Sequence, residues 1–160
     1  MMRNFIIDFW QRRAGDTADA VKMWAVYFKN VQEVMTLFKC GKQQGYFTER
    51  GRVYLQYGKP NQRSQQLVDQ NTYPYEIWQY YRIKDRSNGS ISTNRKFVFV
   101  NKVMGDDCYK LVHSDMRGEI NNDRWQFEVT RNSGNGADPN QASPSGSETN
   151  QLNEIYNNPR

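Results

Sequence analysis

The clearest periodic pattern in the chain is the stretch ADAVKMWAVYFKNVQEVMTLF, from Ala18 to Phe38. Its large apolar residues recur at steps of three and four, the spacing of one face of an α-helix: Val21, Trp24, Phe28, Val31, Met35 and Phe38. Charged side chains, such as those of Lys22, Lys29 and Glu33, lie on the other side. The pattern predicts a long helix whose apolar face belongs to the core.

A shorter, ring-rich helix is expected before the long one. Phe5 and Phe9 are four residues apart, as are Ile6 and Trp10, so each pair shares a helical face. Gly15 interrupts the pattern, and Asp16 or Thr17 is a good N-cap for the next helix. The N-terminal part of the chain therefore predicts two helices that pack at an angle.

Alternating apolar residues after Gly45 predict strands. Val53, Leu55 and Tyr57 would share one face of a first strand, which ends at Gly58. Three more strands are expected over residues 75–82, 96–103 and 109–113. The third strand, KFVFVNKV, is apolar on both faces, which indicates a central position covered on both sides.

A last helix is expected over residues 119–129, with Ile120, Trp125 and Val129 facing inward. The predicted fold class is therefore α+β over residues 1–131. In this fold the N-terminal helical pair packs on a small antiparallel four-stranded meander, which a short C-terminal helix follows.

Residues 132–160 form a tail rich in Asn, Gly, Ser, Pro and Gln, which predicts a flexible, disordered or extended segment. The whole chain has a net charge of +5 and the tail has −2, so the net charge of residues 1–131 is +7. Leu152, Ile155 and Tyr156 are spaced i, i+3 and i+4 near its end. This spacing is typical of a short helix that docks into a groove, and a partner protein is the expected owner of that groove.

The chain of 160 residues is basic, with a net charge of +5, and aromatic residues make up 14% of it. Basic and aromatic residues together are typical of proteins that bind single-stranded nucleic acid. The cations are scattered, however, and no Lys/Arg-Gly-aromatic string occurs. We therefore treat nucleic-acid binding as an alternative and the binding of proteins as the main hypothesis.

Cysteine and histidine are scarce: the chain has Cys40, Cys108 and a single His. A zinc site of four Cys and His ligands is therefore excluded, and we predict no metal and no cofactor. Two free thiols are the expected state, and a Cys40–Cys108 disulfide is the alternative in an oxidising compartment.

No stretch reaches the length of a membrane span, and the start MMRNFIIDFWQRR lacks the features of a signal peptide. We expect a chain that does not insert into a membrane. It is either cytoplasmic, if Met1 is the native start, or a piece of an exported protein.

Five segments in order resemble the GWxTD domain family. The central one is Gly45-Tyr46-Phe47-Thr48-Glu49-Arg50-Gly51, and the others are listed here by their letters: FWQRR at 9–13, PYEIW at 74–78, FVFV at 97–100 and LVHS at 111–114. Tyr46 replaces Trp and Glu49 replaces Asp of the family motif. The resemblance covers residues 5–129 and implies an exported protein of Bacteroidota-type bacteria, located in the periplasm or at the outer membrane.

The motif also has a structural interpretation. Thr48 and Glu49 can bind backbone donors of a turn before the first strand, and Gly51 permits an unusual backbone there. Arg50 or Arg52 can pair with a carboxylate. We favour this interpretation over a catalytic or binding role for the motif.

His113-Ser114-Asp115 contains the residue types of a hydrolase triad, but sequence neighbours cannot adopt triad geometry. No GxSxG elbow is present, so we predict no catalytic residues and no enzyme activity, and an enzyme of unknown type is the third alternative after nucleic-acid binding. Asp106, Asp107 and the later acidic residues match no EF-hand loop.

Recognition by surface contact is the remaining expectation. Aromatic side chains beside Arg are typical anchors of protein interfaces, and four of them are expected on half-exposed strands: Tyr54, Trp78, Tyr80 and Tyr81. The sequence therefore predicts a non-catalytic protein-binding or scaffold module of a cell-envelope assembly.

Overall fold

The structure is a computed structural model that describes residues 2–67, 69–84, 89–103, 105–131 and 146–158. Its elements, in chain order, are α1 (Met2–Ala14), α2 (Thr17–Leu37), the 3-10 turn η1 (Gly45–Phe47), α3 (Glu49–Tyr57), β1 (Gln62–Gln66), β2 (Tyr75–Lys84), β3 (Ile91–Val100), β4 (Lys110–Ser114), α4 (Trp125–Val129) and α5 (Gly146–Asn157). The predicted α+β class is confirmed.

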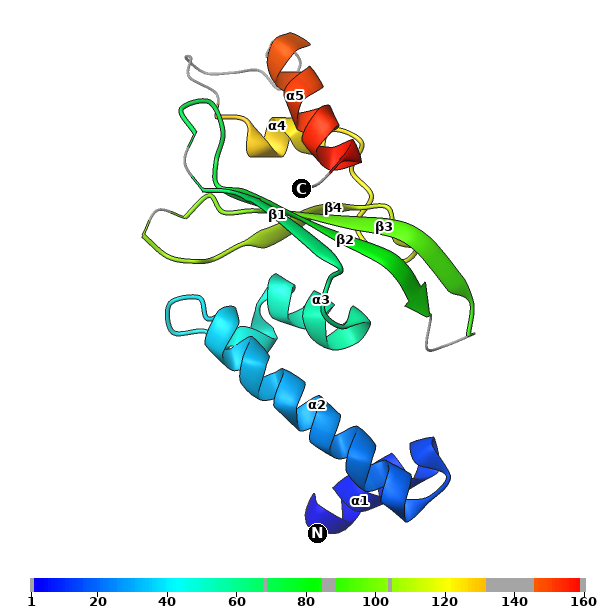
Figure 1. The fold of residues 1–160 in the computed structure, drawn as a ribbon. Coiled ribbons are helices and arrows are strands. Elements are labelled where there is room, and N and C mark those ends of the chain that lie inside the picture. The colour runs from blue at the N-terminus through cyan, green and yellow to red at the C-terminus, as the bar shows by residue number, and fades with distance from the viewer. Residues whose placement is uncertain (1, 68, 85–88, 104, 132–145, 159–160) are drawn as a thin grey trace.

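The four strands form one antiparallel meander in the order β1-β2-β3-β4. Trp78 of β2 pairs with Arg63 of β1 on one side and with Phe97 of β3 on the other. Helix α3 and the C-terminal end of α2 lie against one face of the sheet, and α4 and α5 lie against the other (Figure 1). The body of the molecule is thus three layers deep.

Side chains of β2 and β3 alternate between two hydrophobic clusters, one on each face of the sheet. Phe97 and Phe99 join the cluster under α3, whereas Val98 and Val100 join the cluster under α4 and α5. All four are buried, so the prediction of a central strand covered on both sides is confirmed. The strand begins at Ile91, five residues before the predicted start.

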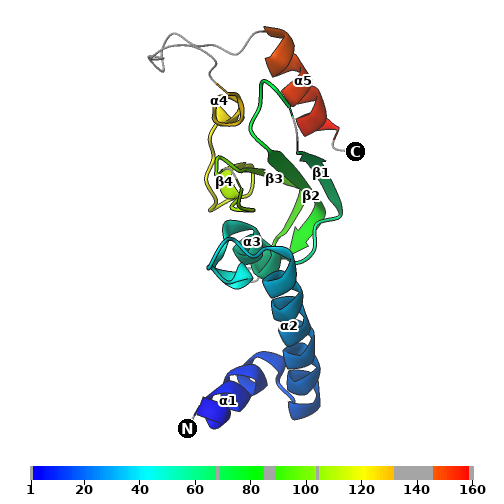
Figure 2. The same cartoon turned by 90° about the vertical axis from the view of Figure 1, so that its left-hand side faces the viewer.

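The long N-terminal helix is confirmed as α2, but the prediction that its apolar face belongs to the core is wrong over most of its length. Val34 and the adjoining Phe38 are buried, whereas Trp24 and Phe28 are exposed. The reason is geometric: only the C-terminal end of α2 meets the body, and the rest projects away from it with α1 at its far end (Figures 1 and 2). We call α1 and α2 together the arm.

The predicted first strand at Val53, Leu55 and Tyr57 is wrong, because these residues belong to helix α3. The buried residues of this segment include Arg50, Val53 and Tyr54, which are spaced i, i+3 and i+4. The alternation of apolar residues is therefore incidental, and the helical face includes a buried arginine. The first strand of the sheet is instead the polar segment β1.

The predicted last helix is shorter than expected, since α4 comprises only Trp125–Val129. Trp125 and Val129 are buried as predicted, whereas Ile120 is exposed and lies outside the helix. Asn122 and Arg124 form turn hydrogen bonds before α4, in which the Asn122 side chain accepts from the Arg124 backbone N–H at 3.0 Å. The chain is still in this turn at Arg124, so α4 begins at Trp125.

The second half of the tail is neither extended nor free of the domain. Residues 132–145 lie outside the described residues, but Gly146–Asn157 forms α5. Leu152 is buried, and Ile155 and Tyr156 pack against the same cluster as Trp125 and Val129. The i, i+3, i+4 spacing does mark a docking helix, yet the surface on which it docks belongs to this chain.

Cys40 and Cys108 form a disulfide, with their Cα atoms 4.8 Å apart, so the expectation of two free thiols is wrong. The bond connects the loop after α2 to the segment before β4. The helical layer and the sheet place the two cysteines within bridging distance although 68 residues separate them in the sequence. Among the described residues, no helix has the length and hydropathy needed to cross a bilayer.

Candidate functional site

The segment Gly45–Gly51 turns the chain from α2 into α3, and Thr48 is the N-cap of that helix. The Thr48 hydroxyl donates to the Gly45 carbonyl oxygen at 2.7 Å and accepts from the Gly51 backbone N–H at 3.1 Å. One side chain thus closes the 3-10 turn and satisfies a free donor of the helix. This confirms the prediction that Thr48 binds backbone groups, although the following element is a helix.

Gly45 and Gly51 lie where the backbones of α2 and α3 approach most closely. A Cβ on Gly45 would lie 2.0 Å from the Val34 carbonyl oxygen, and a Cβ on Gly51 would lie 1.9 Å from the Gly45 carbonyl oxygen. Neither glycine has a positive φ. The motif needs glycine here because no side chain fits, and not because of the unusual backbone predicted for Gly51.

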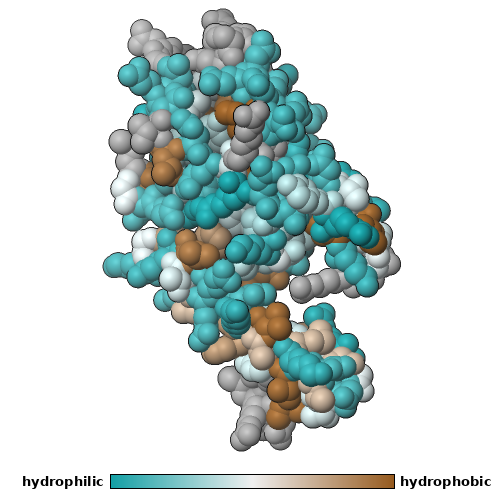
Figure 3. Space-filling view, in the orientation of Figure 1, coloured by the Kyte–Doolittle hydropathy of each residue, from teal (hydrophilic) through white to brown (hydrophobic). Residues whose placement is uncertain are grey.

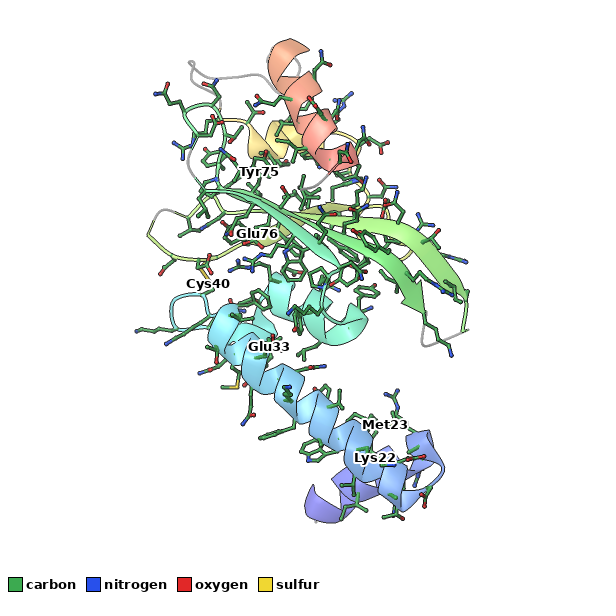
Figure 4. All side chains as sticks on the ribbon, viewed as in Figure 1. Lys22, Met23, Glu33, Cys40, Tyr75 and Glu76 are labelled. Atoms are coloured by element: carbon green, nitrogen blue, oxygen red, sulfur yellow. A yellow bond between two sulfur atoms is a disulfide. The ribbon has the colours of Figure 1, made fainter. Side chains whose placement is uncertain are left out.

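Arg50 lies at the centre of a buried ionic cluster. Its Nη1 donates to Glu76 Oε1 at 2.9 Å, and its Nη2 donates to Asp107 Oδ2 at 2.6 Å and to the Asp107 carbonyl oxygen at 2.8 Å. The guanidinium also lies over the Tyr109 ring, 4.1 Å from its centroid. Figure 4 shows Glu76 on the α3 side of the sheet and its neighbour Tyr75 on the opposite side.

Glu76 is fully buried and receives hydrogen bonds from three further side chains. Arg63 donates to both of its oxygens, at 2.6 and 3.0 Å, and Trp78 Nε1 donates to Oε2 at 2.9 Å. Gln65 Nε2 completes the set at 3.0 Å. With Asp107, the cluster holds two cations and two anions, which is the condition under which charges are tolerated inside a protein.

A second ionic group joins α3 to the segment after β4. Arg52 donates to Glu119 Oε1 and Oε2 at 2.9 and 2.7 Å, and the Tyr57 hydroxyl donates to Oε1 at 2.7 Å. Burial raises the pKa of Glu119, but these hydrogen bonds and the charge of Arg52 outweigh burial and lower it. The predicted pairing of Arg50 or Arg52 with a carboxylate therefore holds for both residues.

Tyr46 of the motif does not join these contacts. Its ring contacts that of Phe47 in a tilted arrangement, with the centroids 4.5 Å apart, and both side chains are exposed. The other motif residues, Gly45, Thr48, Glu49, Arg50 and Gly51, all lie in the turn or the first turn of α3. Glu49 pairs with Arg52 of the same helix at 3.1 Å, and not with the backbone donor that was predicted. Gly45 and Gly51 permit close backbone packing, and Arg50 connects α3 to β2.

Three of the four aromatic residues predicted to form an exposed protein-binding face are buried. Trp78, Tyr80 and Tyr54 belong to the cluster under α3, and only Tyr81 is exposed. Burial, together with nearby Glu33, raises the pKa of Tyr54 to about 12. The correction has a simple cause: α3 covers the sheet face that was expected to be open.

The His113-Ser114-Asp115 sequence does not form a catalytic arrangement. Ser114 Oγ donates to the Lys96 carbonyl oxygen at 2.7 Å and accepts from the Met116 N–H at 3.0 Å, so it closes a turn. The His113 ring accepts from the Asn122 N–H through Nδ1 at 3.2 Å and contacts the Tyr156 hydroxyl through Nε2 at 3.1 Å. Within the described ranges, no three His, Cys, Asp or Glu side chains gather as a metal site would require.

Most of the exposed large apolar side chains on the described surface lie on the arm. Its exposed apolar side chains come from both helices: Ile7 and Phe9 from α1, and Val21, Met23, Trp24, Val26, Tyr27, Phe28, Met35 and Leu37 from α2. Figure 3 shows this apolar surface along the arm, below a body that is mostly hydrophilic in the same view. A groove of about 360 Å³ between the helices is lined by residues such as Trp10, Ala20 and Trp24.

The apolar side chains of α2 were predicted to lie in the core, so the exposed surface of the arm was not predicted. A signal was present: Met23, Val26 and Leu37 lie off the predicted face, so the helix is apolar around much of its circumference. A helix apolar on several sides needs cover from more than one neighbour. Within the described chain only α1 is available along the outer part of α2.

The sequence model of the GWxTD domain matches residues 2–131, which include the arm, the motif and the whole sheet. Comparison of the chain with curated proteins and with solved structures gave no match.

Proposed function

The chain belongs to the GWxTD domain family, and we propose that it is a non-catalytic protein-binding module of a bacterial cell-envelope assembly. The observation that carries the proposal is the arm. Its exposed rings and aliphatic side chains extend from a body whose own core is complete. Large exposed apolar patches on soluble proteins mark sites of interaction, because their contact with water is unfavourable.

The composition of the arm is that of an interface. Trp10, Trp24, Tyr27 and Phe28 lie in ring contact with one another, with centroids 5.5–6.2 Å apart. Aromatic side chains are enriched at the centres of protein interfaces because they bury large areas with few rotatable bonds. Such a surface supports protein binding more directly than the predicted sheet face, of which only Tyr81 remains exposed.

The charged residues of the motif support a non-catalytic role. Arg50 binds both Glu76 and Asp107, and Arg52 binds Glu119. Their side chains are committed to contacts between layers of the fold, so a substrate would have to displace structural partners. The motif is then the part of the domain that holds the arm at a fixed position relative to the sheet.

Two observations weigh against the nucleic-acid alternative. A single-stranded binder stacks bases on exposed rings beside a basic groove, whereas Trp78, Tyr80 and Tyr54 are buried. Arg50, Arg52 and Arg63 are held in ion pairs. Sub-micromolar affinity for single-stranded DNA at physiological salt, with a steep negative salt dependence, would overturn the protein-binding proposal.

The disulfide supports an envelope location, because such bonds persist in the periplasm and are rare in the cytosol. The test is thiol labelling in intact cells of the native host, followed by mass spectrometry. We expect Cys40 and Cys108 to resist alkylation until a reductant is added. Alkylation of both cysteines without reductant would contradict the envelope assignment.

Protein binding by the arm can be tested by placing a photo-crosslinking amino acid at Phe28 in cells. A matched control carries the same amino acid at Arg117, an exposed residue of the body. We expect a crosslinked protein product, of any partner, from position 28 and little or none from position 117. Equal products from both positions, or none from position 28, would overturn the proposal, and a product from Tyr81 instead would restore the sheet face.

A further inference from the structure

The apolar residues of α2 follow a seven-residue repeat. Val21, Phe28 and Met35 are seven apart, and Trp24, Val31 and Phe38 each follow one of them by three residues. These are the a and d positions of a heptad, the pattern by which two helices pack side by side as a coiled coil. The repeat begins at Val21 and ends at Phe38, the C-cap of α2, so it runs over nearly all of the helix. We call these six residues the seam.

Among the described residues, those of the body cover one end of the seam. Phe38 is buried in the body, whereas Val21 is 63% exposed, Phe28 46%, Met35 40% and Trp24 37%. Helix α1 packs beside the seam: the Trp10 ring lies 5.5 Å from that of Tyr27 and 6.1 Å from that of Trp24. Between the two helices a groove of about 360 Å³ remains open along Val21 and Trp24.

The positions that flank the seam carry no charge. They are the e and g positions of the heptad, and they are occupied by Ala20, Ala25, Tyr27, Gln32 and Val34. In coiled coils, charged e and g residues select oppositely charged partners and repel identical ones. The charged residues of α2 lie at b and f positions instead. Nothing along the seam repels an identical helix, and nothing selects a charged partner.

The distribution of charge over the whole chain sets the orientation of such a pair. The arm, residues 2–37, has five cationic and four anionic side chains, so the other residues hold +4 of the total of +5. Two bodies of like charge repel when they lie side by side. If the helices run antiparallel, the bodies lie at opposite ends of a helix about 30 Å long.

The seam has the same spacing when read in reverse, with its centre between Phe28 and Val31. Reversal exchanges Phe28 with Val31, Trp24 with Met35, and Val21 with Phe38. A two-fold pair brings the same surface of both copies together, so that residue i contacts residue j and j contacts i. We propose that the seam of α2 binds the same seam of a second copy of this chain, antiparallel, with the two-fold axis between Phe28 and Val31. The proposal rests on the proposed function, because it names the protein that the arm binds.

The test uses the full chain, purified alone, in sedimentation equilibrium over a wide range of protein concentration. We expect a reversible monomer–dimer equilibrium. Phe28→Glu places one carboxylate from each copy beside the axis, against the apolar Val31 of the other copy, and should raise the dimer dissociation constant by about tenfold or more. Val26→Glu is the matched control, because Val26 is 61% exposed on the same helix but lies off the seam. It should leave the constant within about twofold, as expected of a change outside an interface.

A charge pair tests the orientation. In the antiparallel arrangement Trp24 of one copy faces Met35 of the other, so Trp24→Lys and Met35→Glu should each weaken the dimer, and the double variant should restore it. Far-UV circular dichroism of each variant checks that the arm remains helical. Restoration in the double variant requires a folded arm and therefore excludes simple unfolding as the cause of the single losses.

The outcomes separate this proposal from the proposed function. A wild-type chain that stays monomeric at every concentration, or a dimer that Phe28→Glu leaves intact, overturns the second copy as the occupant of the seam. If position 28 then crosslinks to a different protein in cells, the protein-binding function stands. If position 28 gives no product in cells and the purified chain is monomeric, both proposals are wrong.

Discussion

Arg50 is a cation from which the fold has removed nearly all water: its side chain is 1% exposed, and that of Glu76 is 0%. Such a pair is not a large source of stability, because desolvation of the two charges offsets most of their attraction. Loss of Arg50 would remove one of the two cations beside the buried Glu76, leaving Arg63, and would break the ion pair of Asp107. The cluster therefore penalises any arrangement of α3 that separates Arg50 from β2.

We predict that Arg50→Met lowers the free energy of unfolding by about 3–5 kcal/mol, the usual loss when one member of a buried ion pair is removed. Arg12→Met is the matched control, because Arg12 pairs with Asp8 on the surface with both side chains mostly exposed. It should leave the free energy nearly unchanged. Urea denaturation followed by circular dichroism measures both, and equal midpoints would show that the Arg50 cluster does not constrain the fold.

Some residue roles could be predicted from the sequence and others could not. Thr48 was assigned to backbone contacts because Thr before Glu-Arg-Gly is a local turn or cap pattern. The partner of Arg50 could not be assigned, because Glu76 lies 26 residues away and any of several carboxylates would satisfy it equally well in the sequence. Local hydrogen bonds follow from spacing, but long-range ion pairs depend on the completed fold.

At the scale of elements, the wrong predictions for the first strand and for the apolar face of α2 share a cause. Val53, Leu55 and Tyr57 alternate as in a strand, yet the segment is helical because Thr48 caps it and Arg50 and Tyr54 lie on its buried face. The apolar face of α2 was predicted as core, yet the sheet that it was expected to cover meets α3 instead. In both cases a local pattern was correct about polarity and silent about which neighbour would supply the contact.

The two Trp residues of α2 and β2 provide a matched comparison. Trp78 is 0% exposed and donates to Glu76, so we expect Trp78→Ala to cost about 3–5 kcal/mol of unfolding free energy. Trp24 is 37% exposed and its ring contacts are with Trp10, Tyr27 and Phe28 of the arm, so Trp24→Ala should cost less than about 2 kcal/mol. Urea titrations at low protein concentration, where arms do not pair, provide the measurement. Equal losses would place the arm in the core.

The docking of α5 depends on a neutral histidine. The His113 ring accepts the Asn122 N–H at Nδ1, which leaves Nε2 to donate to Tyr156 of α5. Burial lowers the pKa of His113 below 6.5, although Asp115 and Asp123 act in the opposite direction. Protonation would add a hydrogen to Nδ1, which would then face the Asn122 N–H donor. It would also place a positive charge under α5.

The sign of the pH dependence follows from this lowered pKa. Between 6.5 and the lower folded value the unfolded chain binds the proton and the folded chain does not, so stability falls as the pH falls through this window. The slope is at most about 1.4 kcal/mol per pH unit. Hydrogen exchange of α5 amides should show their protection decrease from pH 7 towards pH 5. His113→Gln should remove this change, and an unchanged profile in that variant would assign it to other groups.

At the scale of the whole molecule, the fold class followed from the sequence because each layer has its own periodic segments, and the resemblance to the family added the order of those segments. The direction of the arm did not follow. A long apolar helix can lie on a sheet only where no other element covers that face, and here α3 covers it. Gly45 and Gly51 permit the close packing of α2, the 3-10 turn and α3, and glycines leave no apolar pattern in the sequence.

The disulfide connects the helical layer to the sheet, and its removal is expected to weaken the whole body. Cys40 and Cys108 are 68 residues apart, and closing a loop of this length restricts the unfolded chain by about 4 kcal/mol in the chain-entropy account. Cys108 also adjoins Asp107, the exposed partner of Arg50, so the bond holds one end of the buried cluster in place. We predict that dithiothreitol lowers the melting temperature of the wild type. A Cys40→Ser/Cys108→Ser variant should melt at the temperature of the dithiothreitol-treated wild type, and dithiothreitol should not change its melting temperature. If the reduced and oxidised proteins unfold at the same urea concentration, the two layers are held together by packing and the ionic cluster alone.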